Sequence, residues 1–276
     1  MSKTVGQSLS GISLTSLAPL YWRAIESLRP DAIIRDERAV ELVNQLQLDF
    51  SQVKRIKMNE LLNAMRIIFT REFDQHVRDF LDRYPVATVV QIGCGFDSRF
   101  ERVDNGDVVW YDLDLPDVIE LRQKLLTDEN ERHHLLACSV FDDSWMEVVK
   151  VHSSNHCLFL AETVFVYFKE TQVRSLVQKL RNKFPGAELV FDGWKPFEIW
   201  LSNRYLSASQ FSGCMQWGIW NARTIEGWGE GIRLLSEWGF FDQPEPRLHS
   251  FRWMAPLFHL AKPMCIFHFI LGKARE

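Results

Sequence analysis

The sequence has few cysteines, no long apolar run and no signal-like start. Its five cysteines form no C-x-x-C pair and are odd in number, which disfavours a disulfide framework and a zinc site: Cys94, Cys138, Cys157, Cys214 and Cys265. The longest apolar stretch, CLFLAETVFVYF, is too short to cross a bilayer and contains Glu162. The first twenty residues lack the continuous apolar core of a signal peptide. We therefore expect a cytoplasmic protein that has no membrane partner and holds no metal.

The chain also lacks an excess of basic residues. Its 276 residues have a formal net charge of -4, so no overall positive field would attract nucleic acid. With 46% hydrophobic and 25% charged residues, it has the composition of an ordinary globular protein. No internal repeat, low-complexity segment or clear linker divides it. We expect a single domain over residues 1–276 and no nucleic acid partner, and the oligomeric state stays open.

The hydrophobic pattern changes its period near Pro85. Before it, apolar residues recur at spacings of three and four, which predicts a helical N-terminal extension over residues 1–84. After it, short apolar runs alternate with amphipathic stretches, which predicts a parallel α/β sheet with crossover helices. The expected strands lie near residues 87–92, 107–112, 134–138, 156–161 and 187–192, and the helices near 116–126, 142–150 and 170–183. The terminal CIFHFILGKA predicts a last strand, antiparallel at or near an edge.

Glycines follow the first expected strand, and acids follow the second. In open α/β sheets, ligands bind beyond the carboxyl ends of the strands. At Gly93 and Gly95 the missing side chains let backbone amides approach a ligand. Asp114 follows nineteen positions after Gly95, a spacing typical of a carboxylate that accepts hydrogen bonds from ribose hydroxyls. The alternative is a simple turn glycine with an aspartate that caps the helix opened by Pro116.

Charge separates the two nucleoside-type ligands that such a pattern can bind. Asp97, within GCGFDSR, would repel the pyrophosphate of a dinucleotide. S-adenosylmethionine has no phosphate but has an ammonium, a sulfonium and a carboxylate, so acids with an arginine suit it better. An NAD(P)-dependent oxidoreductase would also need a longer phosphate loop and a catalytic Tyr/Lys or His arrangement, and we find no such arrangement. The pattern favours the methyl donor.

Four motifs occur in the order found in a known family. TREFD (70–74), GCGFDSRFER (93–102), YDLDLPDVIELRQKLL (111–126) and LAETVFVYF (160–168) resemble the leucine carboxyl methyltransferase family, and most closely its bacterial branch of tetracenomycin polyketide synthesis O-methyltransferases. The resemblance implies a class I methyltransferase fold, α/β and Rossmann-like, with a seven-stranded, mostly parallel sheet. It also implies a core over residues 85–276 with a helical lid inserted at about 193–222. The implied activity is S-adenosylmethionine-dependent O-methyl transfer, with a non-catalytic donor-binding protein as the alternative.

The resemblance also implies residues that bind the donor. Arg71 would hold its carboxylate, Gly93 would lie under its methionine portion, Asp114 would bind its ribose, and Glu162 would face its amino group. Gly95 is a further donor-binding residue in the same turn. For Arg71 the alternative is a solvated helix residue paired with a nearby aspartate. Glu162 lies within an apolar run, and burying its carboxylate without a cationic or hydrogen-bonding partner would cost free energy. A purely structural role is therefore harder to argue for Glu162 than for Arg71.

The segment after the third expected strand departs from the family pattern. Ser139 and Val140 stand where the family usually has an acid and an apolar residue against the adenine. A hydroxyl can still bind the exocyclic amine, but more weakly than a carboxylate does. In addition, Gln91 stands where many class I methyltransferases place an acid.

The acceptor is constrained mainly by ionisation. A carboxylic acid with a pKa near 4 is ionised at neutral pH, whereas a phenol with a pKa near 10 is not, and the gap of roughly three units from pH 7 is about 4 kcal/mol. Phenol methylation therefore needs a general base, while carboxyl methylation mainly needs alignment. None of the eight histidines lies in a motif that marks it as a base. We therefore favour direct in-line methylation of a carboxylate over that of a hydroxyl.

The acceptor pocket is the least determined part of the prediction. Seven of the ten tryptophans lie from Trp194 onward, and they form either core or an aromatic wall for a flat, polyketide-like small molecule. No catalytic residue is assigned. The candidates for the acceptor pocket are Tyr21, Arg23, Arg204, Tyr205 and Trp217.

Overall fold

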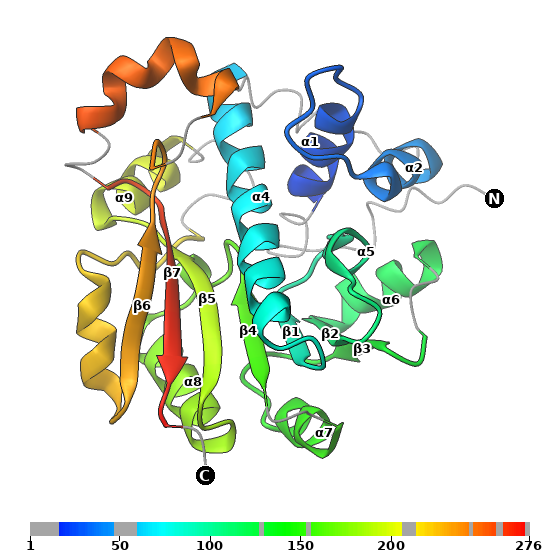
Figure 1. Cartoon of the computed structure of the whole chain (residues 1–276), viewed down its shortest axis with the longest axis vertical. Helices are drawn as coiled ribbons and strands as arrows, with labels where there is room; N and C mark the ends of the chain where they lie inside the picture. Colours follow the sequence, from blue (N-terminus) through cyan, green and yellow to red (C-terminus); the bar gives the residue numbers. More distant parts are fainter. Residues whose placement is uncertain are drawn as a thin grey trace.

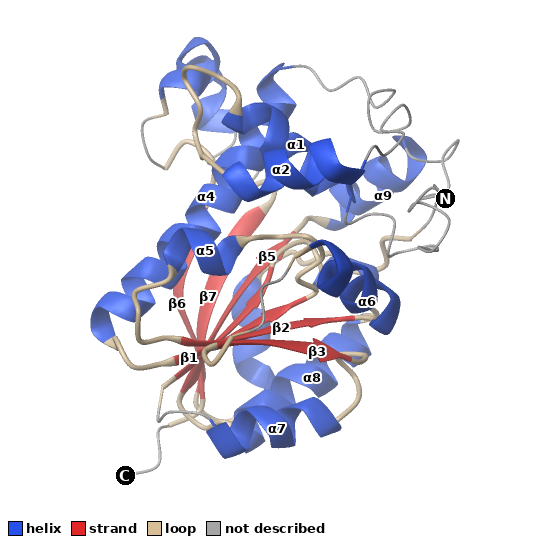
Figure 2. Ribbon diagram, turned by 90° about the vertical axis from the view of Figure 1, so that its right-hand side faces the viewer, coloured by secondary structure: helices blue, strands red, loops and turns tan. Residues whose placement is uncertain are grey.

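The structure is a computed structural model that describes residues 17–46, 60–126, 130–152, 156–205, 214–242, 245–257 and 262–273. Three helices form the N-terminal part: α1 (Leu17–Ser27), α2 (Glu37–Leu46) and the long α4 (Glu60–Arg83). Figure 2 shows α1 and α2 above one end of the sheet, while α4 runs along one face. Within residues 17–46 and 60–84, the described part of the chain before the sheet is therefore mainly helical.

A seven-stranded sheet follows, in the order β3-β2-β1-β4-β5-β7-β6. Its strands are β1 (Thr88–Ile92), β2 (Val109–Asp114), β3 (His133–Ala137), β4 (Cys157–Ala161), β5 (Ala187–Gly193), β6 (Ile232–Trp238) and β7 (Cys265–Leu271). Strands β1 to β5 pair in parallel, whereas β7 is antiparallel to both β5 and β6. This confirms the class I methyltransferase fold and the antiparallel last strand near an edge (Figure 1).

Helices cover both faces of the sheet because its central strands are apolar on both sides. All five residues of β1 are buried, and the adjacent Val89 and Val90 belong to separate core clusters on opposite faces. On one face lie α4 and the short α5 (Arg99–Val103), and on the other lie α7 (Ser144–His152), α8 (Glu170–Lys183) and η5 (Ala222–Trp228). The remaining elements are α6 (Pro116–Leu125), η3 (Phe165–Tyr167), α9 (Pro196–Tyr205) and η6 (Pro246–Met254).

Strand β6 is the one described strand that the periodicity did not predict. It lies at the edge of the sheet and alternates only weakly between buried and exposed residues. An edge strand needs no continuous apolar face, so its sequence, IRLLSEW, does not stand out. Of the helices described, none combines the length and the hydropathy that a bilayer-spanning segment needs.

Candidate functional site

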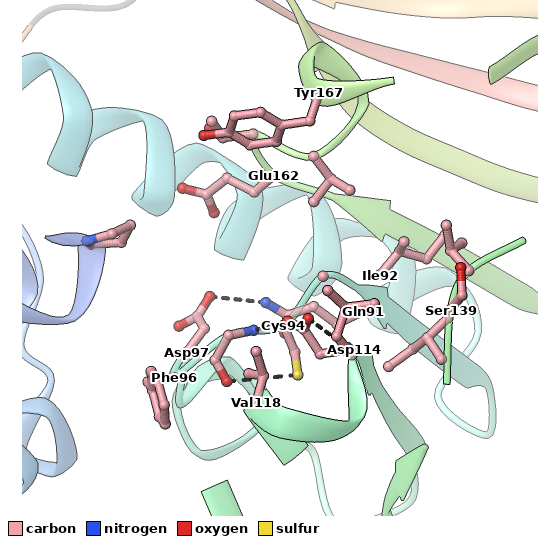
Figure 3. A pocket seen from close by; sticks show the side chains of 18 of the residues that line it. Gln91, Ile92, Cys94, Phe96, Asp97, Asp114, Val118, Ser139, Glu162 and Tyr167 are labelled. Atoms are coloured by element: carbon pink, nitrogen blue, oxygen red, sulfur yellow. Dashed lines mark hydrogen bonds between the residues drawn. The ribbon is translucent and has the colours of Figure 1, made fainter. Parts of the chain in front are cut away.

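A cavity of about 220 Å³ opens beyond the carboxyl ends of β1, β2, β3 and β4. Its lining comes from the ends of these strands and the segments that follow them, together with Pro19 and Arg23 of α1. Figure 3 shows Asp114 at the base, Ser139 to one side, and Glu162 and Tyr167 projecting toward α4. The parallel sheet thus brings together residues that lie far apart in the sequence.

The loop after β1 has a conformation that requires glycine. Gly93 and Gly95 have φ values of +67° and +53°, in the left-handed region that other residues rarely adopt. A Cβ on Gly93 would also lie 2.5 Å from Cγ2 of Val164, in the turn after β4. The Gly95 amide donates a hydrogen bond of 2.7 Å to Oδ2 of Asp114. The glycine turn and the predicted ribose-binding carboxylate are therefore joined directly.

Burial shifts the ionisation equilibrium of Asp114, the last residue of β2. Its Oδ1 accepts a second backbone hydrogen bond, from Leu115 at 2.7 Å. Burial nevertheless dominates and raises the pKa of Asp114 to about 6, against the lowering effect of these two bonds. The group is ionised at neutral pH, and each oxygen keeps a lone pair that a ligand hydroxyl can use.

Glu162 lies on the cavity wall nearest α4 and is partly exposed to it. The Thr70 hydroxyl of α4 donates a hydrogen bond of 2.8 Å to its Oε1, and the Arg99 guanidinium pairs with its Oε2. The next residue, Thr163, has a φ of 55°, and its amide donates to Oδ1 of Asp192 at 2.5 Å. Glu162 thus has both a cationic partner and a rigid turn behind it.

The wall formed by the loop after β3 contains both residues predicted to face the adenine. Ser139 and Val140 line the cavity, and the Ser139 hydroxyl accepts a hydrogen bond of 3.3 Å from the Phe141 amide. On β1, the amide nitrogen of Gln91 donates to Oδ2 of Asp97 at 3.0 Å. Its carbonyl oxygen, Oε1, is buried and has no partner among the described residues. Sequence reasoning noted the position of Gln91 but did not include it among the ligands.

Asp97, the loop acid that disfavoured a dinucleotide, is buried within a cluster of arginines. Burial by itself would raise its pKa, but Arg102, Arg99 and Arg23 outweigh this cost and hold the pKa of Asp97 well below its usual value. Arg102 donates to its Oδ1 at 2.9 Å. Asp97 is therefore ionised, and its charge is already neutralised by protein groups.

Arg71 does not lie among the residues that line the described cavity. Its guanidinium pairs with Glu245 at 2.5 Å and with Glu72 at 3.0 Å. To reach the donor's carboxylate it would have to leave these partners. Its predicted role stays a prediction.

Of the five acceptor candidates, Arg23 is the one that lines the cavity. Its guanidinium donates hydrogen bonds to Oδ2 of Asp36 at 2.8 Å and to the Phe96 carbonyl at 2.7 Å. Trp217 lies in the core instead, stacked on Phe191 at a centroid distance of 6.4 Å, so its indole is not available to a ligand in this cavity.

The other three candidates lie away from the described cavity or outside the description. Arg204 is exposed and lies 5.9 Å from the centroid of the Trp200 ring. Tyr21 is half-buried on α1 and does not line the cavity. Tyr205 ends α9, and its side chain lies outside the part that the structure describes.

Comparisons with known proteins agree with this geometry. The sequence profile of the leucine carboxyl methyltransferase family matches residues 16–181. The tetracenomycin polyketide synthesis O-methyltransferase TcmP of Streptomyces glaucescens is 30% identical over 238 residues, which are 86% of this chain and 86% of TcmP. The S-adenosyl-L-methionine-dependent methyltransferase dpfgK of Gibberella zeae is 25% identical over 90% of this chain and 88% of its own.

Two crystal structures share the fold at low sequence identity. One, described as a methyltransferase from Thermobifida fusca, has a TM-score of 0.62 and 14% identity and covers 97% of each chain. The other is magnesium protoporphyrin IX methyltransferase (ChlM) from Synechocystis PCC 6803 with S-adenosylhomocysteine bound, with a TM-score of 0.50 and 12% identity over 86% of this chain and all of that one.

Proposed function

Because the chain belongs to the leucine carboxyl methyltransferase family, and is an S-adenosylmethionine-dependent O-methyltransferase, we propose that it methylates a carboxylate of a small organic acceptor. A hydroxyl is the second candidate. The name of TcmP connects that relative with polyketide synthesis, so polyketide-like aromatic acids are the acceptor class to test first. We place the reaction in the cytoplasm, where thiols stay reduced, because none of the five cysteines is paired.

The residues around the cavity fit the donor. The unpartnered, buried Oε1 of Gln91 and the carboxylate of Glu162 are acceptors for its ammonium group. Asp114 would accept hydrogen bonds from its ribose hydroxyls, and Ser139 would bind the adenine amine. When bound, S-adenosylmethionine supplies a methyl group on a sulfonium, which an oxygen nucleophile attacks in line. The observation on which this assignment mainly rests is the hydrogen bond between Gly95 and Asp114, because it fixes the carboxylate beside the glycine turn.

Preference for a carboxylate rests on proton chemistry. The described residues that line the cavity include no histidine, and two of their three carboxylates, Asp97 and Glu162, are paired with arginines. The third, Asp114, accepts hydrogen bonds from two backbone amides and would be occupied by the donor's ribose hydroxyls. A phenol would need one of these groups to leave its partner and take the proton, at a cost of several kcal/mol for a buried pair. A carboxylate is already ionised and needs only to be oriented.

Two measurements test the proposal. Calorimetric titration should give saturable binding of S-adenosylhomocysteine and none of NADH, and the bound ligand should raise the unfolding temperature. Turnover is then measured with methyl-labelled S-adenosylmethionine on aryl carboxylic acids and on matched phenols. The product of carboxyl methylation is an ester that alkali hydrolyses to labelled methanol, whereas an aryl methyl ether survives. Binding without any turnover would favour the alternative of a non-catalytic donor-binding protein.

A further inference from the structure

Arg66 is a cation near the cavity, and none of the proposed contacts with the donor involves it. It lies on α4, and its guanidinium is 4.3 Å from the centroid of the Trp22 ring of α1. The side chain of Arg66 is exposed, and within the described part of the chain no carboxylate forms an ion pair with it. Figure 1 shows α1 beside the upper half of α4, so the pair lies where these two helices meet.

The position of Arg66 connects it with the cavity. Thr70 lies one helical turn further along α4, and its hydroxyl donates to Glu162, which lines the cavity. Residues four apart share one face of a helix, so Arg66 lies on the face of α4 that meets the cavity. Desolvation lowers the pKa of Arg66 overall, and Tyr167, another lining residue, is close enough to oppose this shift. The guanidinium therefore lies close to the cavity, between Trp22 of α1 and the lining residue Tyr167.

The neighbouring arginines are all committed to other groups. Arg23 pairs with Asp36, Arg71 with Glu245 and Glu72, and Arg99 with Asp74 and Glu162. Among the described residues, none accepts a hydrogen bond from the Arg66 guanidinium, whose five N–H donors form a fork that matches a carboxylate. The Trp22 ring beside it offers a flat apolar surface to the body of the same ligand.

We propose that Arg66 and Trp22 recognise the acceptor: the guanidinium binds one oxygen of the carboxylate to be methylated, and the indole packs against an aromatic body. This inference rests on the proposed function. The other oxygen attacks the methyl carbon, so that an O–CH₃ bond forms as the CH₃–S bond breaks. The carboxylate's negative charge and the sulfonium's positive charge disappear together, and no proton or co-reactant is needed. Because the ester product is uncharged, it loses the attraction of Arg66 and leaves.

The experiment measures two probes, 2-naphthoate and methyl 2-naphthoate, by calorimetry on the full chain saturated with S-adenosylhomocysteine. The wild-type protein should bind the acid at least about tenfold more tightly than the ester, the scale of one charge-assisted hydrogen bond. Arg66→Ala should lose about tenfold for the acid and change ester binding less than about twofold. Arg66→Lys, which keeps the charge, should retain part of the preference. Arg233→Ala, which removes an exposed arginine of the edge strand β6, is the matched control and should behave as wild type.

Each contrary result has a separate meaning. Equal affinity for acid and ester in the wild type, or acid binding that is unchanged in both Arg66 variants, overturns the acceptor site. Weakened S-adenosylhomocysteine binding in Arg66→Ala would also overturn it, since Arg66 would then hold the donor's carboxylate. If the wild-type protein does not bind S-adenosylhomocysteine at all, the proposed function itself fails. The lysine variant and thermal unfolding of each protein distinguish a local effect from a folding defect.

Discussion

Donor affinity should depend on pH through Asp114. The ribose hydroxyls donate to the ionised carboxylate, and burial raises the pKa of this group to about 6 in the protein without ligand. Affinity for S-adenosylhomocysteine should therefore be constant above about pH 7 and fall as Asp114 takes up a proton. At pH 5 only about one molecule in ten is ionised, so affinity should be about tenfold lower, or about 1.4 kcal/mol. Calorimetric titrations from pH 8 to pH 5 measure this slope.

The variant Asp114→Asn tests the assignment. It replaces a charged acceptor with a neutral amide and should weaken binding at pH 8 by about 1.5 to 3 kcal/mol, while the slope between pH 7 and pH 5 becomes smaller. Glu120→Gln is the control, because Glu120 is an exposed carboxylate on the following helix that pairs with Lys124. Wild-type affinity that is the same at pH 5 and pH 8, or an Asp114→Asn protein with the full slope, would refute the reasoning.

Two further predictions concern the turns behind the site. Burial raises the pKa of Asp192 to about 7, above its unfolded value of 3.8, so it should cost up to about 4 kcal/mol of stability as the pH rises from about 4 to 7. Asp192→Asn should flatten this part of the stability profile in denaturant titrations, and parallel profiles would contradict the assignment. Gly93→Ala should lower stability by about 1 to 3 kcal/mol, because its Cβ meets Val164 at 2.5 Å. Thermal unfolding should show partial recovery when Val164→Ala is added, and no recovery would mean that the φ of Gly93 dominates.

Most of the fold can be predicted from the sequence because its signals are local. The runs that became β1 and β4 are mostly apolar and are buried at every position, a pattern that short segments reveal by themselves. Strand β6 was missed for the opposite reason. Its neighbour β7 provides its pairing, and its exposed outer residues, such as Arg233 and Leu235, give no buried face to detect.

The site residues likewise divide into those that local sequence predicts and those that depend on long-range packing. Gly93 and Glu162 each follow a strand directly, and Asp114 ends one, so the order of a parallel sheet is enough to bring them to one edge. The partner of Arg71 could not be predicted, because Glu245 lies 174 positions away. Trp217 likewise looked like a pocket residue until packing placed its ring in the core. Contacts between residues so far apart in the sequence depend on how whole helices and strands pack together, and the hydrophobic periodicity of the sequence does not encode this packing.

The contacts of α1 explain why donor and acceptor positions can be fixed relative to each other. Arg23 on α1 reaches both Asp36, before α2, and the Phe96 carbonyl in the glycine loop, so the N-terminal helices are fastened to the loop that would hold the donor. Breaking a buried ion pair of this kind by removing one partner costs about 3 to 5 kcal/mol. Trp22 precedes Arg23 in the same helix and is therefore held by the same contacts. The surface proposed for the acceptor thus has a fixed position relative to the donor loop, which is the alignment that methylation of an already ionised carboxylate requires.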